Sequence, residues 1–127
     1  MTPERLSQLL ATRERETVEF KKAANGVPSS VYETICAFLN HRGGDILLGV
    51  ADDGTVLGVP DDTVDQICAD IASATSNGNL FSPPYLVYPQ KLQYQGQWIV
   101  HIQVPESSQT HQLRGVVYDR GADGDFK

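Results

Sequence analysis

Hydrophobic positions recur along the chain at two spacings, which separate helical from extended segments. Near the start, Leu6, Leu9 and Leu10 follow each other at the spacing of one helical face. The tripeptide Thr2-Pro3-Glu4 just before them is typical of a helix start, because proline is tolerated in the first turn. Apolar and charged side chains then alternate in Thr17–Lys21, as in a half-buried strand. The pattern predicts a short opening helix followed by a strand.

The next segment predicts a second helix and a buried strand. Ser30, with Glu33 three residues later, forms a capping-box pattern ahead of a helical run of apolar residues. Arg42-Gly43-Gly44 predicts the end of that helix, because glycine can leave a helix through a positive φ. A phosphate-binding loop is disfavoured there, since a strand and not a helix follows. The continuous apolar run Ile46–Val50 is typical of a central strand.

A tight turn and a third helix are predicted in the middle of the chain. Asp52-Asp53-Gly54 favours a hairpin turn into a partner strand at Thr55–Val59. Asp61 and Asp62 are candidate N-caps of the third helix, which should end near Asn77-Gly78.

The last third of the chain is predicted to be mainly extended. Tyr85–Tyr94 and Trp98–Val104 flank a Gln95-Gly96 turn, and Val116–Tyr118 is a last short strand. The whole pattern predicts an α/β (α+β) fold, with a mixed β-sheet of five or six strands and about three helices. A chain of 127 residues fits one domain, so we expect residues 1–127 to fold as a unit.

Composition limits the cellular compartment and the cysteine chemistry that we expect for this protein. Hydrophobic residues make up 40% of the chain, which is enough to bury a core. No apolar run approaches the roughly 18 residues of a membrane span, and the start lacks the pattern of a secretion signal, so a cytoplasmic protein is expected. Cys36 and Cys68 lie in helix-like apolar patterns, which indicates two buried thiols and not a disulfide framework.

The net charge limits how the chain could bind nucleic acid. The net charge is −6, with ten basic and sixteen acidic residues. Non-specific binding to phosphates depends on Lys and Arg that release counterions, so the chain should not coat nucleic acid by bulk attraction. Any nucleic-acid site must therefore be a local basic patch.

Four segments together carry a family resemblance. They are Glu14–Lys21, Ile35–Asn40, Gly43–Val50 and Asp52–Val59. In this order and spacing they resemble the Schlafen-type, AlbA-like domain of bacterial transcriptional regulators and animal Schlafen proteins. The closing Val117–Gly121 is similar to the last strand of that family, so the resemblance covers residues 12–121.

The resemblance implies a nucleic-acid-binding domain of a transcriptional regulator, with DNA or RNA as the partner and no required cofactor. Bacterial members often continue into an ATPase-like or winged-helix region, so the chain would be the N-terminal domain of a longer regulator. The candidate phosphate contacts are its basic residues near strand and helix ends, because guanidinium and ammonium groups bind phosphate. They are Lys21, Lys22, Arg42, Arg114 and Arg120.

The resemblance also implies an alternative, because some animal members are metal-dependent endoribonucleases that hold a divalent metal with three carboxylates. Glu14, Glu19 and Asp52 match those positions. Hard Mg²⁺ or Mn²⁺ prefers oxygen ligands and can activate water. The animal enzymes use two lobes where this chain has one, and a homodimer would supply the second. With sixteen acidic residues in the chain, the three acids could equally be solvated surface, and binding is favoured over catalysis.

A third interpretation is a protein-interaction or oligomerisation module, which the acidic charge favours. No Ser or Cys motif gives the histidines a catalytic partner, so His101 is predicted to be a plain sheet residue and His41 and His111 plain surface residues. Tyr94 and Tyr118 could stack on bases, but their strand positions favour packing within the sheet.

Overall fold

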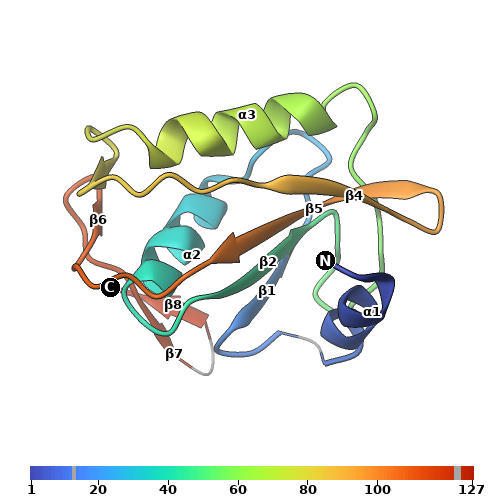
Figure 1. The fold of residues 1–127 in the computed structure, drawn as a ribbon, viewed down its shortest axis with the longest axis horizontal. Coiled ribbons are helices and arrows are strands. Elements are labelled where there is room, and N and C mark those ends of the chain that lie inside the picture. Colours follow the sequence, from blue (N-terminus) through green and yellow to red (C-terminus); the bar gives the residue numbers. More distant parts are fainter. Residues whose placement is uncertain (13, 122–123) are drawn as a thin grey trace.

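The computed structural model describes residues 1–12, 14–121 and 124–127. In this part of the chain helices and strands alternate up to residue 75, and strands follow one another after it (Figure 1). The helices are α1 (Pro3–Thr12), α2 (Ser29–Leu39) and α3 (Val64–Thr75). The strands are β1 (Val18–Lys21), β2 (Gly44–Leu48), β3 (Phe81–Ser82), β4 (Gln90–Tyr94), β5 (Gln97–Val104), β6 (Gln112–Leu113), β7 (Asp119–Gly121) and β8 (Gly124–Phe126).

The main sheet is mixed and has the strand order β1-β2-β5-β4. β1 and β2 are parallel, whereas β5 runs antiparallel to both β2 and β4. The remaining strands form two small antiparallel pairs, β3 with β6 and β7 with β8. The predicted α+β fold, with about three helices and a mixed sheet, is confirmed, and its strands are shared between a four-stranded sheet and two small ones.

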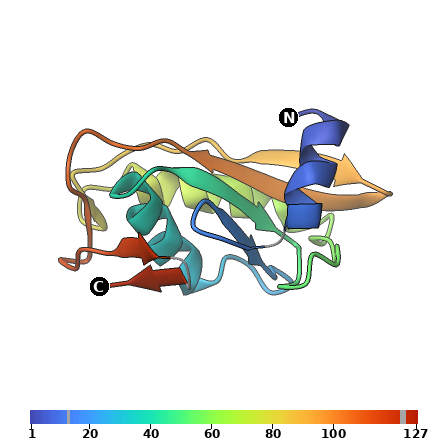
Figure 2. The ribbon, with the colours of Figure 1, turned by 90° about the horizontal axis from the view of Figure 1, so that it is seen from below.

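The two faces of the sheet are covered differently. Buried residues of α2 and α3, such as Ile35 and Ile71, pack with Ile46 and Ile102 in the larger apolar cluster. On the opposite face, α1 packs through Leu6 and Leu9 against β1, β2 and β5 in a smaller cluster. Figures 1 and 2 both place α1 and α2 towards opposite ends of the molecule. One face is therefore covered by two helices and the other by a single short helix.

Both predicted helix caps are wrong. Helix α2 begins at Ser29 with Pro28 as its N-cap, and no side chain caps it. Thr63 is the N-cap residue of α3, again without a side-chain hydrogen bond. The carbonyl oxygen of Pro60 accepts the N–H groups of both Thr63 and Val64, at 3.0 and 3.1 Å. This turn starts α3 through the backbone, so Asp61 and Asp62 lie before the helix and do not cap it.

The predicted turns fit the structure better than two of the predicted short strands do. Gly43 has φ 73° and donates its N–H to the carbonyl of Phe38 at 2.9 Å, so the predicted glycine end of α2 is confirmed. The hairpin partner predicted at 55–59 forms only isolated bridges, one of them between Val50 and Val56. Leu57 and Gly58 both donate to the carbonyl of Gly49, which breaks the alternation of a regular ladder. The short strand predicted at 116–118 likewise forms only an isolated bridge between Val116 and Leu113, and β7 begins after it at Asp119.

Both thiols are free, and burial raises the pKa of each. Cys36 is fully buried, as predicted, whereas Cys68 is only partly buried. Within residues 1–12, 14–121 and 124–127, no helix combines the length and the apolar character that a bilayer crossing needs.

Candidate nucleic-acid interface

Two of the three predicted metal ligands are neighbours at the start of β1. An oxygen of Glu14, Oε1, accepts the backbone N–H of Phe20 at 3.0 Å, and the carboxyl group of Glu14 also hydrogen-bonds that of Glu19. Burial raises the pKa of Glu14 to about 7, helped by the hydrogen bond to Glu19 and by the charges of Glu19 and Asp52. The N–H of Phe20 opposes this rise. Glu14 and Glu19 therefore share one site, while Asp52 acts on it through its charge.

Glu19 is also half of a buried ion pair. Its Oε1 lies 2.7 Å from Nη1 of Arg120, and its Oε2 lies 3.7 Å from Nζ of Lys21. The same Nη1 reaches Oδ1 of Asp125 at 2.8 Å. Only 3% of the surface of Arg120 is exposed. The remaining guanidinium nitrogens of Arg120 donate to the carbonyls of residues 15, 16 and 18.

These groups line a polar cavity of about 440 Å³ between β1, the first turn of α2 and the β7–β8 hairpin. Its carboxylates come from Glu14, Glu19, Glu33 and Asp125. In the part of the chain that the structure describes, no group of three or more His, Cys, Asp or Glu side chains is close enough to hold a metal ion. Two neighbouring carboxylates that oppose each other's ionisation suit a divalent cation, but Asp52 does not complete a three-carboxylate cage in this arrangement.

The predicted basic contacts do not form one patch. Because β1 and β2 are parallel, Lys21 and Lys22 at the end of β1 lie at the opposite end of the sheet from Arg42, which precedes β2. Arg114 lies at a third place, in an exposed turn, where its backbone N–H donates to the carbonyl of Leu80. Lys22 and Arg42 are exposed, but Lys21 faces the acidic cavity.

Arg120 is not available for the phosphate contact that was predicted for it. It is buried, and all of its donor nitrogens are already used within the protein. The same residue instead joins the β7–β8 hairpin to β1.

A second arginine lies beside Arg42. Arg15, Glu16, Thr17 and Arg42 line a small cleft of about 390 Å³. Arg15 is exposed, and the Arg42 side chain is 61% exposed although it pairs with Glu16. Glu16 is also bound by Nε2 of His41 at 2.8 Å. The hydrogen bond from His41, together with the charge of Arg42, lowers the pKa of Glu16. The cleft thus presents two guanidinium groups around one carboxylate.

The family model described as "Schlafen, AlbA_2" matches residues 14–126. This chain belongs to the Schlafen, AlbA_2 family. The match extends the predicted resemblance through β8, the strand that carries Asp125. No curated protein matches the chain.

Two solved structures are similar to this Schlafen, AlbA_2 domain. One is the N-terminal domain of a "Putative ATP-dependent DNA Helicase RecG-related Protein" from Nitrosomonas europaea. It is 30% identical, with a TM-score of 0.62, over 81% of this chain and 71% of that one. The other is the DIP2311 protein from Corynebacterium diphtheriae, with 17% identity and a TM-score of 0.68. That likeness covers 97% of this chain but 25% of the other, and it shows the shared fold alone.

The histidines of this Schlafen, AlbA_2 domain differ from their predicted roles. The prediction that His111 lies on the surface is wrong, because it is fully buried and bonds the carbonyl of Pro83 and the hydroxyl of Ser107, each at 2.7 Å. His41 is partly buried and paired with Glu16. His101 is a sheet residue, as predicted, but its Nε2 lies 2.7 Å from Oδ1 of Asp45.

Sequence reasoning missed two features of the structure, namely Arg15 in the cleft and the Asp45–His101 pair. A signal for Arg15 was present, since it is a basic residue within the segment that carries the family resemblance. Asp45 and His101 are 56 residues apart and meet only through the pairing of β2 with β5. Tyr94 of β4 packs against the smaller apolar cluster, as its strand position favoured, and Tyr118, which lies just before β7, packs against the larger one.

Proposed function

We propose that this domain binds nucleic acid and that Arg15 and Arg42 hold its backbone phosphates in the cleft beside Glu16. The observation that carries the proposal is that two exposed guanidinium groups border one cleft in a chain whose net charge is −6. Guanidinium groups bind phosphate oxygens in a bidentate way and release counterions from nucleic acid. Family membership and the likeness to a RecG-related helicase domain support the same partner.

The remaining basic residues are secondary in this proposal. Lys22 and Arg114 are exposed and would contact phosphates further along a longer nucleic acid. Lys21 is directed to an acidic cavity, so its charge is already balanced by Glu19. Arg120 is left out because it is buried.

The cellular role proposed for the domain is the nucleic-acid-binding part of a transcriptional regulator in the cytoplasm. The support is membership of the Schlafen, AlbA_2 family, together with the resemblance of the sequence to that family's bacterial regulators. A homodimer would place two Arg15–Arg42 clefts on one nucleic acid and so raise the affinity without a new contact.

The test is the salt dependence of binding, measured by fluorescence anisotropy with a labelled DNA duplex and a labelled RNA hairpin. Replacing both arginines, Arg15→Ala with Arg42→Ala, should weaken binding and reduce the slope of log affinity against log salt by about 2. Lys91→Ala is the matched control, because Lys91 is an exposed cation on β4 that pairs with an acidic residue, Asp65. An unchanged slope in the double variant would contradict the proposed cleft.

A second candidate function is metal-dependent cleavage of RNA, and the closeness of Glu14 and Glu19 favours it. When bound, Mg²⁺ or Mn²⁺ would supply an activated water and neutralise charge on the scissile phosphate. Glu14 and Glu19 would hold the ion, and Asp52 in the exposed turn would act on it through its charge. No metal is required under the first proposal.

Cleavage is tested with structured RNA in Mn²⁺ and in EDTA. Manganese-dependent cutting that is lost in Glu14→Gln, Glu19→Gln and Asp52→Asn would establish this second function. Glu33→Gln is the matched control, because Glu33 lines the same cavity without belonging to the predicted set.

A protein that neither binds nor cuts nucleic acid, yet forms a stable oligomer in light scattering, would instead support the interaction module.

A further inference from the structure

One end of the sheet face below α1 is polar and uncovered. Asp45 is opposite Gln103 in the register of β2 with β5, and His101 is opposite Gln90 in the register of β5 with β4. Cross-strand partners share a face, so these four side chains lie on the same face as Leu47, which α1 covers. The cover by Leu6 and Leu9 extends over the apolar end of this face only.

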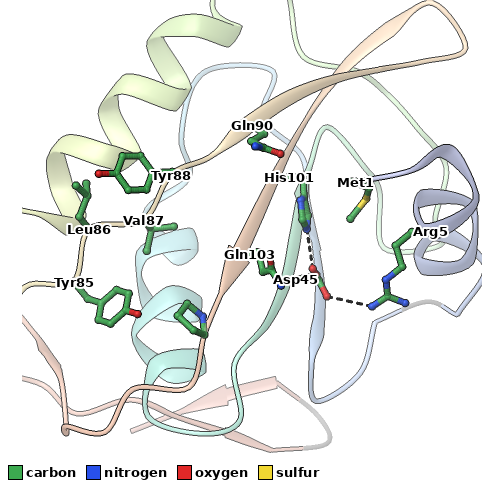
Figure 3. Close-up of a pocket in the computed structure, with 11 residues that line it drawn as sticks. Met1, Arg5, Asp45, Tyr85, Leu86, Val87, Tyr88, Gln90, His101 and Gln103 are labelled. Carbon is green, nitrogen blue, oxygen red and sulfur yellow. Dashed lines mark hydrogen bonds and ion pairs between the residues drawn. The ribbon is translucent and has the colours of Figure 1, made fainter.

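The open end is a groove of about 600 Å³ (Figure 3). Figure 3 shows Met1 and Arg5 on one side of it and the segment Tyr85–Tyr88 on the other. Asp45, His101 and Gln103 lie between these two sides. The volume is within the range of roughly 300–1,000 Å³ that small-molecule and cofactor sites occupy.

The carboxylate of Asp45 has two partners in the groove, His101 and Arg5. Nε2 of His101 lies 2.7 Å from Oδ1 of Asp45, and an arginine nitrogen of Arg5 lies 3.7 Å from Oδ2. The side chains of His101 and Asp45 are 8% and 17% exposed, so this pair is shielded from water. The negative charge of Asp45 therefore has a positive group beside it, and the groove can receive a neutral polar ligand.

Apolar and aromatic side chains border the same groove in an exposed position. Tyr85, Leu86 and Tyr88 are 36%, 40% and 74% exposed. Their segment has no regular secondary structure, yet it is anchored, because Tyr85 and Val87 donate their N–H groups to Thr75. The Tyr85 ring also packs edge-on against His111, with ring centroids 6.0 Å apart. The aromatic border is thus held in place before a ligand arrives.

We infer that this groove binds an unpaired base of single-stranded nucleic acid. An exposed tyrosine offers a stacking surface to a base, and every base has an aromatic face to offer in return. The exposed amides of Gln90 and Gln103 each carry donors and an acceptor, which match the hydrogen-bonding edges of a base. A base is uncharged, which suits a groove where Arg5 is already paired with Asp45.

This inference rests on the proposed function and adds a second contact to it. The Arg15–Arg42 cleft would hold phosphates in any nucleic acid, whereas the groove would accept only a base that is not paired. Together they would give the domain a preference for single strands or for the end or loop of a duplex.

The test is anisotropy with labelled hexathymidylate, hexauridylate, an abasic hexamer and a DNA duplex of twelve pairs. Tyr88→Ala should weaken binding of at least one base-carrying hexamer about tenfold and leave duplex and abasic binding unchanged. Phe126→Ala is the matched control, because Phe126 is a 54% exposed aromatic residue of β8 outside the groove, and it should change none of these affinities. The DNA and RNA hexamers distinguish which sugar is accepted.

The outcomes separate the two proposals. If the duplex binds and hexamer binding does not depend on Tyr88, the groove inference is overturned and the phosphate cleft stands. If a hexamer binds through Tyr88 while the duplex does not bind at all, the groove stands and the cleft is overturned. If no probe binds, both fall. A titration followed by NMR adds an independent check, since the side-chain amide signals of Gln90 and Gln103 should shift with the hexamer and not with the duplex.

Discussion

Nη1 of Arg120 lies 2.7 Å from Oε1 of Glu19, although the two residues are 101 positions apart in the chain. The contact ties the β7–β8 hairpin to β1, and Asp125 completes it from β8 at 2.8 Å. Arg120 and Glu19 are both buried, with 3% and 8% of their surfaces exposed. A basic residue that the sequence suggested for phosphate binding is therefore part of the core, and the acidic cavity beside it has a cation of its own.

Replacing Arg120 should destabilise the fold. Arg120→Ala leaves the Glu19 carboxylate buried without its partner, and loss of one member of a buried pair typically costs about 3–5 kcal/mol. Arg120→Lys should recover only part of this, because an ammonium group cannot make the five hydrogen bonds of the guanidinium. Urea unfolding followed by circular dichroism measures the loss. A change below about 1 kcal/mol for Arg120→Ala would contradict the role assigned to this contact.

Glu14 should make the stability of the metal-free protein depend on pH. Its folded-state pKa of about 7 lies above the ordinary 4.5, so the folded state binds the proton more tightly than the unfolded state does. This stabilisation is complete below pH 4.5 and is lost as the pH rises through 7. In EDTA, the free energy of unfolding should therefore fall between pH 5 and pH 8 by more in the wild type than in Glu14→Gln. Equal pH profiles for the two proteins would show that Glu14 titrates normally.

Removing the charge of Glu16 should strengthen phosphate binding. Glu16 pairs with Arg42 inside the cleft, so it competes with a phosphate for the same guanidinium. Glu16→Gln frees that charge, and the affinity for duplex DNA at low salt should rise a few-fold, because an exposed ion pair of this kind is weak. Glu4→Gln, in the first turn of α1, removes the same charge from outside the cleft and serves as the control. An equal rise in both variants would mean that only net charge matters.

Gly44, the first residue of β2, lies close to Phe38 near the end of α2 and to Thr17 just before β1. A Cβ atom there would lie 2.7 Å from both the Phe38 ring and the carbonyl oxygen of Thr17. Gly44→Ala should lower the free energy of unfolding by about 1–3 kcal/mol, as overpacking in a core does. Gly78→Ala is the matched control, since nothing lies within 4 Å of a Cβ atom at that position. Thermal unfolding compares the two variants, and similar midpoints would contradict the tight contact.

Local patterns in the sequence predicted most of the fold, because periodicity and turn chemistry act over a few residues. The alternation of Thr17–Lys21 became β1, and the glycines at 43 and 44 ended α2. The capping box at Ser30 failed because a backbone turn already starts the helix after Pro28. Such competition between side-chain and backbone hydrogen bonds cannot be seen in residue types alone.

The candidate site was harder to predict, because its parts meet only through tertiary structure. Glu14 and Glu19 lie on either side of the turn that leads into β1, so their closeness follows from a short spacing. Arg120 was predicted to contact phosphate because guanidinium groups bind phosphate, and nothing near it in sequence reveals the buried carboxylate of Glu19. The groove at Asp45 and His101 likewise depends on strand register across 56 residues.

The most direct test of nucleic-acid binding is a titration of the wild-type chain into labelled duplex DNA, single-stranded DNA and structured RNA. The titration is done at low and moderate salt, with EDTA or Mn²⁺, and both mobility and strand integrity are read. The account predicts binding in EDTA that weakens steeply as salt increases, because phosphate contacts release counterions. No binding to any of these probes at low salt would contradict it.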